Sequence, residues 1–183
     1  MKASPLPRGD AEAKAILEAP PSDTLEGLRD RAILSILLFH GLRRAELCQP
    51  TISDMQFRRG VLHFRVQGKG GKIRYMPIHP HSLQRISKYL EFCGHGEDTS
   101  SALFLPVKNS FGRLDNALTG HAVYKDVVIK YARQLGLDPN AVCVHGLRAT
   151  AATNALDHEA DIAKVQEWLG HANISTTRLY DQR

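Results

Sequence analysis

The chain of 183 residues is long enough for one domain, or at most two small ones. Hydrophobic residues make up 43% and charged residues 23%, which allows the chain to bury a core. The longest apolar run, Ala32–Phe39, falls far short of the roughly 18 residues that a membrane span needs. Because the N-terminus also lacks the apolar stretch of a signal peptide, the composition excludes a membrane protein and favours a cytoplasmic one.

Charge and cysteine usage narrow the possible functions further. The 24 Lys and Arg residues exceed the 19 Asp and Glu residues, and the net charge of +5 permits a nucleic-acid partner without demonstrating one. Cys48, Cys93 and Cys143 form no C-x-x-C pair, so neither a disulfide framework nor a zinc site is predicted. The nine histidines are scattered, and the P-loop, H-E-x-x-H and G-x-S-x-G patterns are absent. We therefore expect no metal and no cofactor, and we interpret His79-Pro80-His81 as a solvated turn.

The N-terminal part of the chain is predicted to be an arm followed by two helices. Residues 1–8, stiffened by Pro5 and Pro7, lack apolar periodicity and are typical of a linker. Helical spacing of apolar residues predicts helices over residues 11–18 and 25–40. The second helix is apolar nearly all round and stops at Gly41, so we expect it to be buried.

The next segment alternates apolar and polar residues and predicts a small sheet. Leu62–Val66 and Ile73–Ile78 form two strands separated by the Gly68–Gly71 turn, and Met55–Phe57 adds a third. Pro80 then opens a helix, and the rest of the chain is predicted to be helical near residues 82–92, 120–135, 145–156, 161–169 and 175–180. The predicted fold class is therefore α+β, mainly α with a small antiparallel three-stranded β-sheet.

Two polar clusters flank the predicted sheet. In Gly41-Leu42-Arg43-Arg44-Ala45-Glu46-Leu47, a helical turn would bring Arg43 and Glu46 together at spacing i,i+3, either as a site or as a surface ion pair. Lys69 lies between glycines at the tip of the predicted hairpin. Its side chain could reach a nucleic-acid groove or a phosphate, or it could simply be a solubilising turn residue.

Two further clusters lie in the C-terminal third. In His145-Gly146-Leu147-Arg148, helical spacing puts the imidazole beside the guanidinium, either buried with partners or lining a site. In the segment from Trp168 to Tyr180, Gly170 suits the end of a helix, so His171 would project from the corner. Tyr180 alone could be an ordinary half-buried tyrosine.

Taken together and in this order, the four clusters resemble the catalytic domain of the tyrosine recombinases, the lambda-integrase and Xer-type family. The resemblance covers about residues 9–183 and implies that fold, without a metal or a nucleotide cofactor. It implies transesterification of a DNA phosphodiester, in which Tyr180 attacks the phosphate and forms a 3′-phosphotyrosyl link. Arg43 and Arg148 would hold the non-bridging phosphate oxygens, for which the planar guanidinium is suited.

The remaining roles are implied by the same resemblance. Lys69, rather than the nearby Lys72, would protonate the leaving 5′-oxygen. His145 would assist proton transfer, and His171 would donate to a non-bridging oxygen and help to place Tyr180. Glu46 would orient the groups of the site. Independently of the resemblance, four further basic residues are candidate contacts to the DNA backbone or simply solubilising residues: Arg44, Lys72, Arg74 and Arg178.

The family pattern also implies partners and a domain organisation. Family members usually carry an N-terminal core-binding domain and a C-terminal tail that docks on a neighbouring protomer. Neither matches this sequence, so we expect residues 1–8 to be an arm and residues 9–183 a catalytic domain, either excised or naturally minimal. Double-stranded DNA is the expected partner, together with other protomers in a tetrameric synapse. The chain alone should be a monomer, cytoplasmic and nucleoid-associated, that binds DNA weakly and in a salt-dependent way.

Three other functions stay open at this point. A type IB topoisomerase-like nicking-closing enzyme uses the same tyrosine and arginine chemistry. A non-catalytic DNA-binding module could keep the fold without the reaction, and a metal nuclease is a third, weaker alternative. Among recombinases, the sequence fits both a mobile-element integrase and a chromosome-dimer resolvase.

Overall fold

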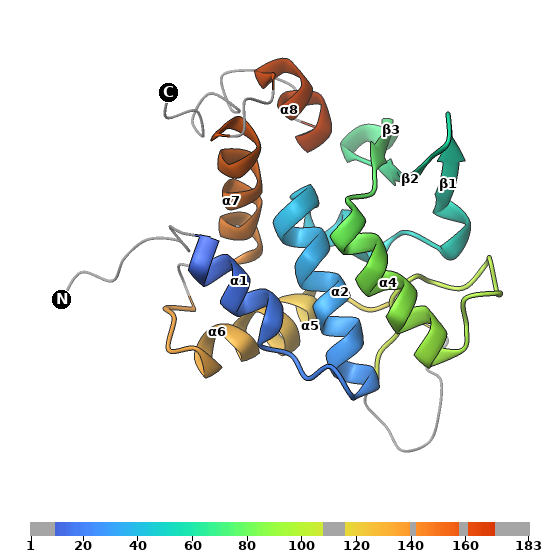
Figure 1. Cartoon of the computed structure of the whole chain (residues 1–183). Coiled ribbons are helices and arrows are strands. Elements are labelled where there is room, and N and C mark those ends of the chain that lie inside the picture. The colour runs from blue at the N-terminus through green and yellow to red at the C-terminus, as the bar shows by residue number, and fades with distance from the viewer. Residues whose placement is uncertain (1–9, 108–115, 140–141, 158–160, 171–183) are drawn as a thin grey trace.

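The computed structural model describes residues 10–107, 116–139, 142–157 and 161–170. Its centre is helix α2 (Leu25–His40), which lies among α1 (Asp10–Glu18), α4 (Pro80–Cys93) and α7 (Val144–Asp157) (Figure 1). Because apolar residues occur on nearly every side of α2, most of its side chains are buried against these neighbours. The prediction of a buried second helix is confirmed.

Both ends of α2 are defined by local chemistry. The hydroxyl of Thr24 accepts a hydrogen bond from the backbone N–H of Gly27 at 3.1 Å and caps the first turn. At the other end, Gly41 has a φ of 59°, a left-handed conformation that glycine adopts without steric cost. The chain therefore turns sharply at Gly41, and the residues that follow lie at the C-terminal end of the central helix.

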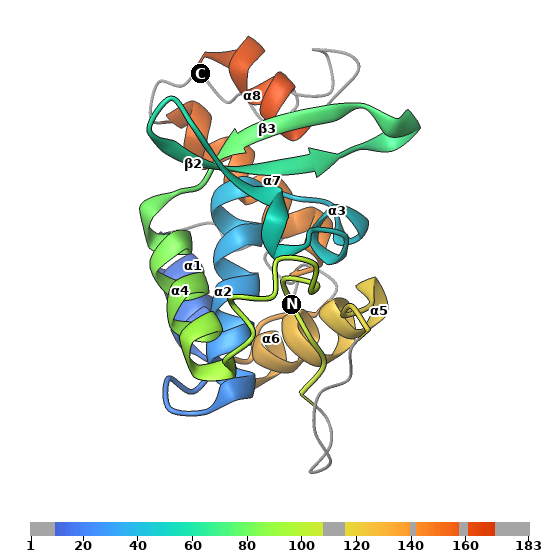
Figure 2. The same ribbon diagram turned by 90° about the vertical axis from the view of Figure 1, so that its right-hand side faces the viewer.

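The predicted sheet is present as an antiparallel meander. Strands β1 (Met55–Arg58), β2 (Val61–Gln67) and β3 (Ile73–Pro77) pair in the order β1-β2-β3. Phe64 pairs with Met76, and both side chains are buried together with Val66. The sheet lies across the C-terminal end of α2, and the β2–β3 hairpin extends over α3 (Arg44–Cys48) (Figure 2).

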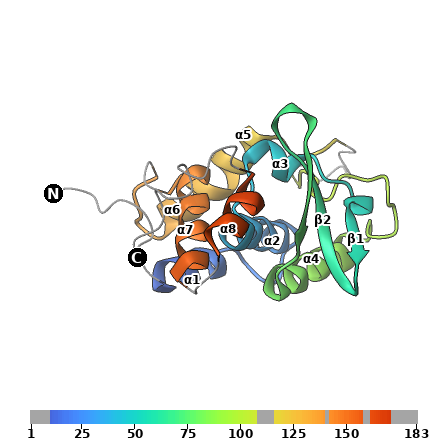
Figure 3. The ribbon, with the colours of Figure 1, turned by 90° about the horizontal axis from the view of Figure 1, so that it is seen from above.

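The described residues from 120 onward are mainly helical, as predicted, and the helix predicted near residues 175–180 lies outside the described residues. A helix starts at α5 (Gly120–Ala122), continues through a π-helical stretch, Val123–Ile129, and ends in α6 (Lys130–Gln134). Helix α7 packs on α2, and α8 (Ile162–Leu169) packs on α7. Seen from above, α8 lies over α2 (Figure 3). The C-terminal ends of α2 and α8 are thereby brought close to each other.

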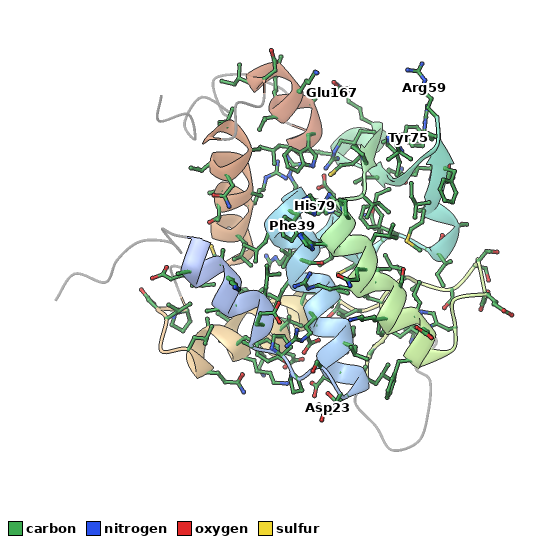
Figure 4. The ribbon with its side chains drawn as sticks, in the orientation of Figure 1. Asp23, Phe39, Arg59, Tyr75, His79 and Glu167 are labelled. Atoms are coloured by element: carbon green, nitrogen blue, oxygen red, sulfur yellow. The ribbon has the colours of Figure 1, made fainter. Side chains whose placement is uncertain are left out.

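The His79-Pro80-His81 segment corrects one prediction, because it is not a solvated turn. His79 is the N-cap of α4, and its ring accepts a hydrogen bond from the backbone N–H of His81 at 3.2 Å. The same ring stacks on Phe39, with centroids 4.3 Å apart and an interplanar angle of 2° (Figure 4). This stack joins the start of α4 to the end of α2.

Three further observations bear on the predicted class of protein. Among the described helices, none combines the length and the apolar character that crossing a membrane requires. All three cysteines are unpaired. Burial raises the pKa of the Cys48 thiol to about 11, so this thiol is protonated at neutral pH.

Candidate active site

The first part of the site is built where α2 ends and α3 begins. Arg43 is the N-cap residue of α3, and Glu46 is three positions further on. One carboxylate oxygen of Glu46 accepts the backbone N–H of Arg43 at 2.9 Å, and the other accepts the guanidinium Nη1 at 2.8 Å. The predicted i,i+3 pair is therefore confirmed. It is not a plain surface ion pair, because the Arg43 side chain is 40% exposed whereas that of Glu46 is only 4% exposed.

Glu46 binds a second guanidinium, which comes from the sheet. Arg74 on β3 donates from Nη1 to Oε1 at 3.1 Å and from Nη2 to Oε2 at 2.9 Å, a bidentate pair. Burial on its own would raise the pKa of Glu46. The hydrogen bonds from Arg74 and from the Arg43 backbone outweigh that effect and hold the pKa of Glu46 below its ordinary value. The carboxylate is therefore ionised at neutral pH and binds both arginines.

Arg148 forms the second part of the site. It lies on α7, is 3% exposed, and donates from Nη1 to the backbone carbonyl of Gly41 at 2.5 Å. Its Nη2 donates to the carbonyl of Leu169. Both acceptors lie at helix ends, where backbone carbonyls lack helical partners and the helix dipole is negative. A single buried guanidinium thus joins the C-terminal ends of α2 and α8 to α7.

Three arginines converge on the end of α8. We call the backbone of Trp168, Leu169 and Gly170 the α8 corner, and each of its three carbonyls accepts a hydrogen bond from a different arginine. The donors are Arg74 Nε to Trp168 at 2.9 Å, Arg148 Nη2 to Leu169, and Arg43 Nη2 to Gly170 at 3.3 Å. The corner directly precedes His171.

Gly170 is needed at this corner for two reasons. Its φ is 65°, in the left-handed region that favours glycine. A Cβ built on it would also lie 3.2 Å from Arg74 Nη1 and 3.5 Å from Arg43 Nη1. The predicted helix stop at Gly170 is confirmed, and the structure adds that the space beside it is filled by guanidinium groups.

The electrostatics of this cluster suit an anion. Two guanidiniums, those of Arg43 and Arg74, bind the carboxylate of Glu46, and a third, that of Arg148, binds the α8 corner, so positive charge is in excess in this cluster. Within the described ranges, no group of three His, Cys, Asp or Glu side chains is arranged to hold a metal ion. The arrangement can therefore bind a phosphate group through arginine hydrogen bonds.

The hairpin that carries Lys69 starts from the same cluster. The backbone N–H of Gly68 donates to the carbonyl of Lys72 at 2.7 Å, which closes the turn at Lys69–Gly71. A Cβ built on Gly68 would lie 3.2 Å from Arg74 Nη1 and 3.7 Å from Glu46 Oε1. Lys69 and Lys72 are both exposed on this turn. The predicted turn is confirmed, and the roles of the two lysines stay predictions.

The structure describes only some of the other predicted site residues. His145 lies on α7, one turn before Arg148, and its side chain is outside the described set. His171, Arg178 and Tyr180 also lie outside the described residues. Arg44 is exposed on α3, with its guanidinium 5.6 Å from the centroid of the Tyr124 ring.

Arg74 is where the sequence interpretation needs revision. It was expected to contact the DNA backbone, but its side chain is 13% exposed and binds Glu46 and the α8 corner. The strand pattern held the signal for this placement. Arg74 stands two residues before the buried Met76 and pairs with the buried Val66, so it faces inward.

Comparison with known proteins gives a consistent result. A model of the phage integrase family matches residues 10–183. Tyrosine recombinase XerD of Xanthomonas axonopodis pv. citri is 34% identical over 180 residues, covering 93% of this chain and 56% of the relative. Tyrosine recombinase XerC of Pelobacter propionicus is 39% identical over 169 residues, covering 92% and 52% respectively. The chain thus spans about half the length of these curated relatives.

Solved structures show the same fold. A crystal structure of XerA recombinase superposes with a TM-score of 0.77 at 27% identity, covering 99% of this chain and 62% of that one. The XerH site-specific recombinase bound to palindromic difH substrate, in a post-cleavage complex, superposes with a TM-score of 0.79 at 27% identity, covering 98% and 50%. The predicted class, mainly α with a three-stranded antiparallel sheet, is confirmed.

Proposed function

Because the chain belongs to the phage integrase family, we propose that it is the catalytic domain of a site-specific DNA recombinase that cuts and rejoins strands through a 3′-phosphotyrosyl intermediate. One observation carries the proposal. Arg43 and Arg148, which come from different halves of the sequence, converge with Arg74 on the α8 corner. That corner leads directly into the segment that carries His171 and Tyr180.

In this proposal the two catalytic arginines bind the scissile phosphate. Negative charge builds on the non-bridging oxygens in the pentavalent transition state, and a guanidinium stays charged at any working pH. Arg43, with its exposed side chain held at one end by Glu46, can donate toward an incoming phosphate. Arg148, which now donates to the carbonyls of Gly41 and Leu169, would reach the same oxygens from the α7 side by exchanging one of these carbonyls for the phosphate. Two fixed guanidiniums supply the charge stabilisation without a metal ion.

The proposed chemistry is a transesterification that conserves the number of phosphoester bonds. The Tyr180 hydroxyl forms a bond to phosphorus, loses its proton, and displaces the 5′-oxygen of the next nucleotide. Lys69 gives that oxygen a proton from the hairpin turn. His145 assists proton transfer, and His171 donates to a non-bridging oxygen. The 5′-hydroxyl of a partner strand then reverses the step, so no external energy source is required.

The buried tyrosines make poor competitors for the role of nucleophile. The chain holds five tyrosines, of which Tyr89 and Tyr131 are buried. The Tyr89 hydroxyl accepts a hydrogen bond from the Leu105 backbone at 3.1 Å, and the Tyr131 hydroxyl donates to Asp30 at 2.9 Å. Burial raises the pKa of both phenols, which disfavours their attack on a phosphate. Neither buried phenol is therefore the proposed nucleophile, and the choice of Tyr180 rests on the family resemblance.

The partners follow from the same proposal. Double-stranded DNA is the substrate, and synapsis involves further protomers, whereas the chain alone is a monomer in the cytoplasm, associated with the nucleoid. Arg44, Lys72 and Arg178 are retained as contacts to the DNA backbone. Residues 9–183 form the catalytic domain in this scheme. XerH bound to its difH substrate is a structural neighbour that binds DNA, which supports the assignment.

A nicked suicide duplex tests the proposal. Cleavage frees a short fragment that carries the 5′-hydroxyl and ends at the nick. This fragment diffuses away, so the reverse reaction is prevented and the covalent protein–DNA complex is trapped and resolved on a denaturing gel. We expect a covalent band with the wild-type chain in the presence of a chelator, and none with Tyr180→Phe. Absence of the band from the wild type would favour a non-catalytic DNA-binding module, and loss of cleavage on chelation would favour a metal nuclease. Relaxation of plasmid without strand exchange would favour the topoisomerase alternative.

A further inference from the structure

We propose that Arg74 is a positioning residue for DNA cleavage, which holds Glu46, and through it Arg43, against the α8 corner. The proposal rests on the proposed recombinase function. Arg74 uses all three of its guanidinium nitrogens on groups of the site: Nη1 and Nη2 on Glu46, and Nε on the Trp168 carbonyl. It thereby joins β3, α3 and α8 through one planar group.

The first consequence concerns the charge of Glu46. Each carboxylate oxygen is shared: Oε1 lies 2.8 Å from Arg43 Nη1 and 3.1 Å from Arg74 Nη1, and Oε2 accepts the Arg43 backbone and Arg74 Nη2, each at 2.9 Å. Without Arg74, this buried carboxylate would be neutralised by Arg43 alone. Arg43 would then be bound more tightly to the carboxylate and would have less charge available for a phosphate.

The second consequence concerns the position of α8. Next to the contact with Arg74, β3 and α8 are separated by a cavity of about 650 Å³, lined by Phe39, Tyr75, His79 and Trp168 among others. Tyr75 and Glu167 mark its two sides in Figure 4. Arg74 and Trp168 both line this cavity, and the hydrogen bond from Arg74 to the Trp168 carbonyl joins its two sides, as does the contact of Trp168 Nε1 with Met76. Arg74 therefore controls where the corner before His171 is held.

The third consequence concerns the hairpin. Arg74 follows Lys69 by five residues, and its guanidinium lies against the base of the same turn, beside Gly68. Strand β3, which begins after the Lys69 turn, is thus anchored through Arg74 to the Arg43–Glu46 pair. One side chain ties together the group that binds the phosphate, the corner before the nucleophile segment, and the loop of the proposed general acid.

This role differs from a contact to the DNA backbone in a measurable way. A backbone contact needs a guanidinium nitrogen that can donate to DNA, whereas Nε, Nη1 and Nη2 of Arg74 all donate to groups of the protein. Loss of a backbone contact reduces the dependence of DNA binding on salt, by about 0.9 in the slope of log K against log salt per contact. Loss of a positioning residue reduces the rate of cleavage at saturating DNA and leaves that slope unchanged.

The experiment measures single-turnover cleavage of the suicide duplex by Arg74→Lys and Arg74→Gln in the full chain. For Arg74→Gln we expect the rate constant to fall about 10- to 100-fold, as when a group that supports a catalytic side chain is lost. Arg74→Lys should recover part of this loss, because it restores the charge but not the bidentate geometry. The dissociation constant for DNA and its salt slope should stay within two-fold of wild type. Combining Arg74→Gln with Glu46→Gln should add little to the slower single variant.

Arg31→Gln is the matched control. Arg31 is 19% exposed and likewise bonds a carboxylate, that of Glu18, and backbone carbonyls, but it lies on α2 away from the site. This variant should lose stability and keep the wild-type rate constant.

Four results would overturn the role of Arg74. The first is a rate constant for Arg74→Gln equal to that of wild type, and the second is a lower yield of active Arg74→Gln protein with a normal rate constant. The third is a smaller salt slope of DNA binding together with normal cleavage at saturating DNA. The fourth is a double variant, Arg74→Gln with Glu46→Gln, whose loss of rate equals the sum of the two single losses in free energy. A wild-type chain that forms no covalent complex at all would instead overturn the proposed function, and the role of Arg74 with it.

Discussion

The arginines of the site differ in burial. We therefore expect the buried one to contribute to both the stability of the fold and the rate of cleavage, and the exposed one mainly to the rate. Arg148 is 3% exposed and binds the carbonyls that end α2 and α8, whereas the Arg43 side chain is 40% exposed. A lysine at either position keeps the charge but loses the planar fork. Stability and cleavage therefore need to be measured together in both variants.

We predict that Arg148→Lys and Arg43→Lys slow cleavage to a similar extent and destabilise the fold to different extents. Each loses a preorganised donor to the phosphate, which costs roughly 10²–10³ in rate. Arg148→Lys should also lower the free energy of unfolding by about 1–3 kcal/mol, because it leaves buried carbonyls unpaired. Arg43→Lys should cost less than about 1 kcal/mol. Urea unfolding together with single-turnover cleavage checks this, and equal stability losses would contradict it.

His40 makes stability depend on pH. Burial, helped by the charge of His79, lowers the pKa of His40 from 6.5 to about 3. The unfolded chain therefore binds a proton below pH 6.5 that the folded chain excludes, so stability is full above that pH and falls toward pH 3. One proton corresponds to at most about 1.4 kcal/mol per pH unit.

We predict that His40→Gln flattens the acid limb of this stability profile. Glutamine keeps an acceptor for the backbone N–H of His79, which now donates to His40 Nε2 at 3.4 Å. Urea unfolding at a series of pH values between 6.5 and 3 measures the slope for this variant and for the exposed control His121→Gln. The account fails if both variants keep the wild-type slope, or if His121→Gln is the one that flattens it.

At the scale of single elements, we expect the turn at the end of α8 to affect the rate of DNA cleavage as well as the stability of the fold. Gly94, which ends α4, and Gly170, which ends α8, are both left-handed, with φ of 72° and 65°. A Cβ on Gly94 would meet nothing within 4 Å, whereas one on Gly170 would lie 3.2 Å from Arg74 Nη1, so this guanidinium would have to shift. We predict that alanine at either position costs about 1–2 kcal/mol of stability. Only Gly170→Ala should slow cleavage, and equal cleavage rates would contradict the role of the corner.

The hairpin permits a chemical test of the proposed general acid. Lys69→Met should slow cleavage by about 10²–10⁴-fold on ordinary DNA. A 5′-bridging sulfur should restore most of the rate, because a thiolate leaves without being protonated. Lys72 lies on the other side of the same turn. Lys72→Met should weaken DNA binding, and its cleavage rate should not be restored by the 5′-bridging sulfur. Rescue of Lys72→Met instead of Lys69→Met would show that the acid was assigned to the wrong lysine.

Local patterns predicted most of the elements and one contact of the site. Helical spacing gave the Arg43–Glu46 pair, because both residues lie in a single turn. It could not give the bonds from Arg74 and Arg148 to the α8 corner, since these join residues 94 and 21 positions apart. The stacking of His79 on Phe39 was missed because Phe39 lies on another helix, 40 positions earlier in the chain.

At the scale of the whole molecule, the fold brings three distant segments to one end of α2. The class and the strand order follow from periodicity, but the meeting point depends on how α7 and α8 pack across α2. The resemblance to the recombinases supplied that arrangement where the residue pattern alone did not. Arg44, Lys69 and Lys72 are exposed on the segments that follow this end of α2, and we expect DNA to cover that face.

We predict that duplex binding by the 183-residue chain is weak and strongly salt-dependent. Contacts to phosphates dominate such binding, and each one contributes about 0.9 to the slope of log K against log salt. Fluorescence anisotropy across a salt series measures this slope, and Arg44→Gln and Lys72→Met should each reduce it by about one contact. Tight binding that is insensitive to salt would contradict this view of the surface.

The most direct test of the central claim is to locate the covalent bond. The protein–DNA complex trapped on the suicide duplex is digested with nuclease and protease, and mass spectrometry identifies the modified peptide. We predict a nucleotide attached through its 3′-phosphate to Tyr180. Attachment to Tyr75 or Tyr124, or linkage through a 5′-phosphate, would contradict the account.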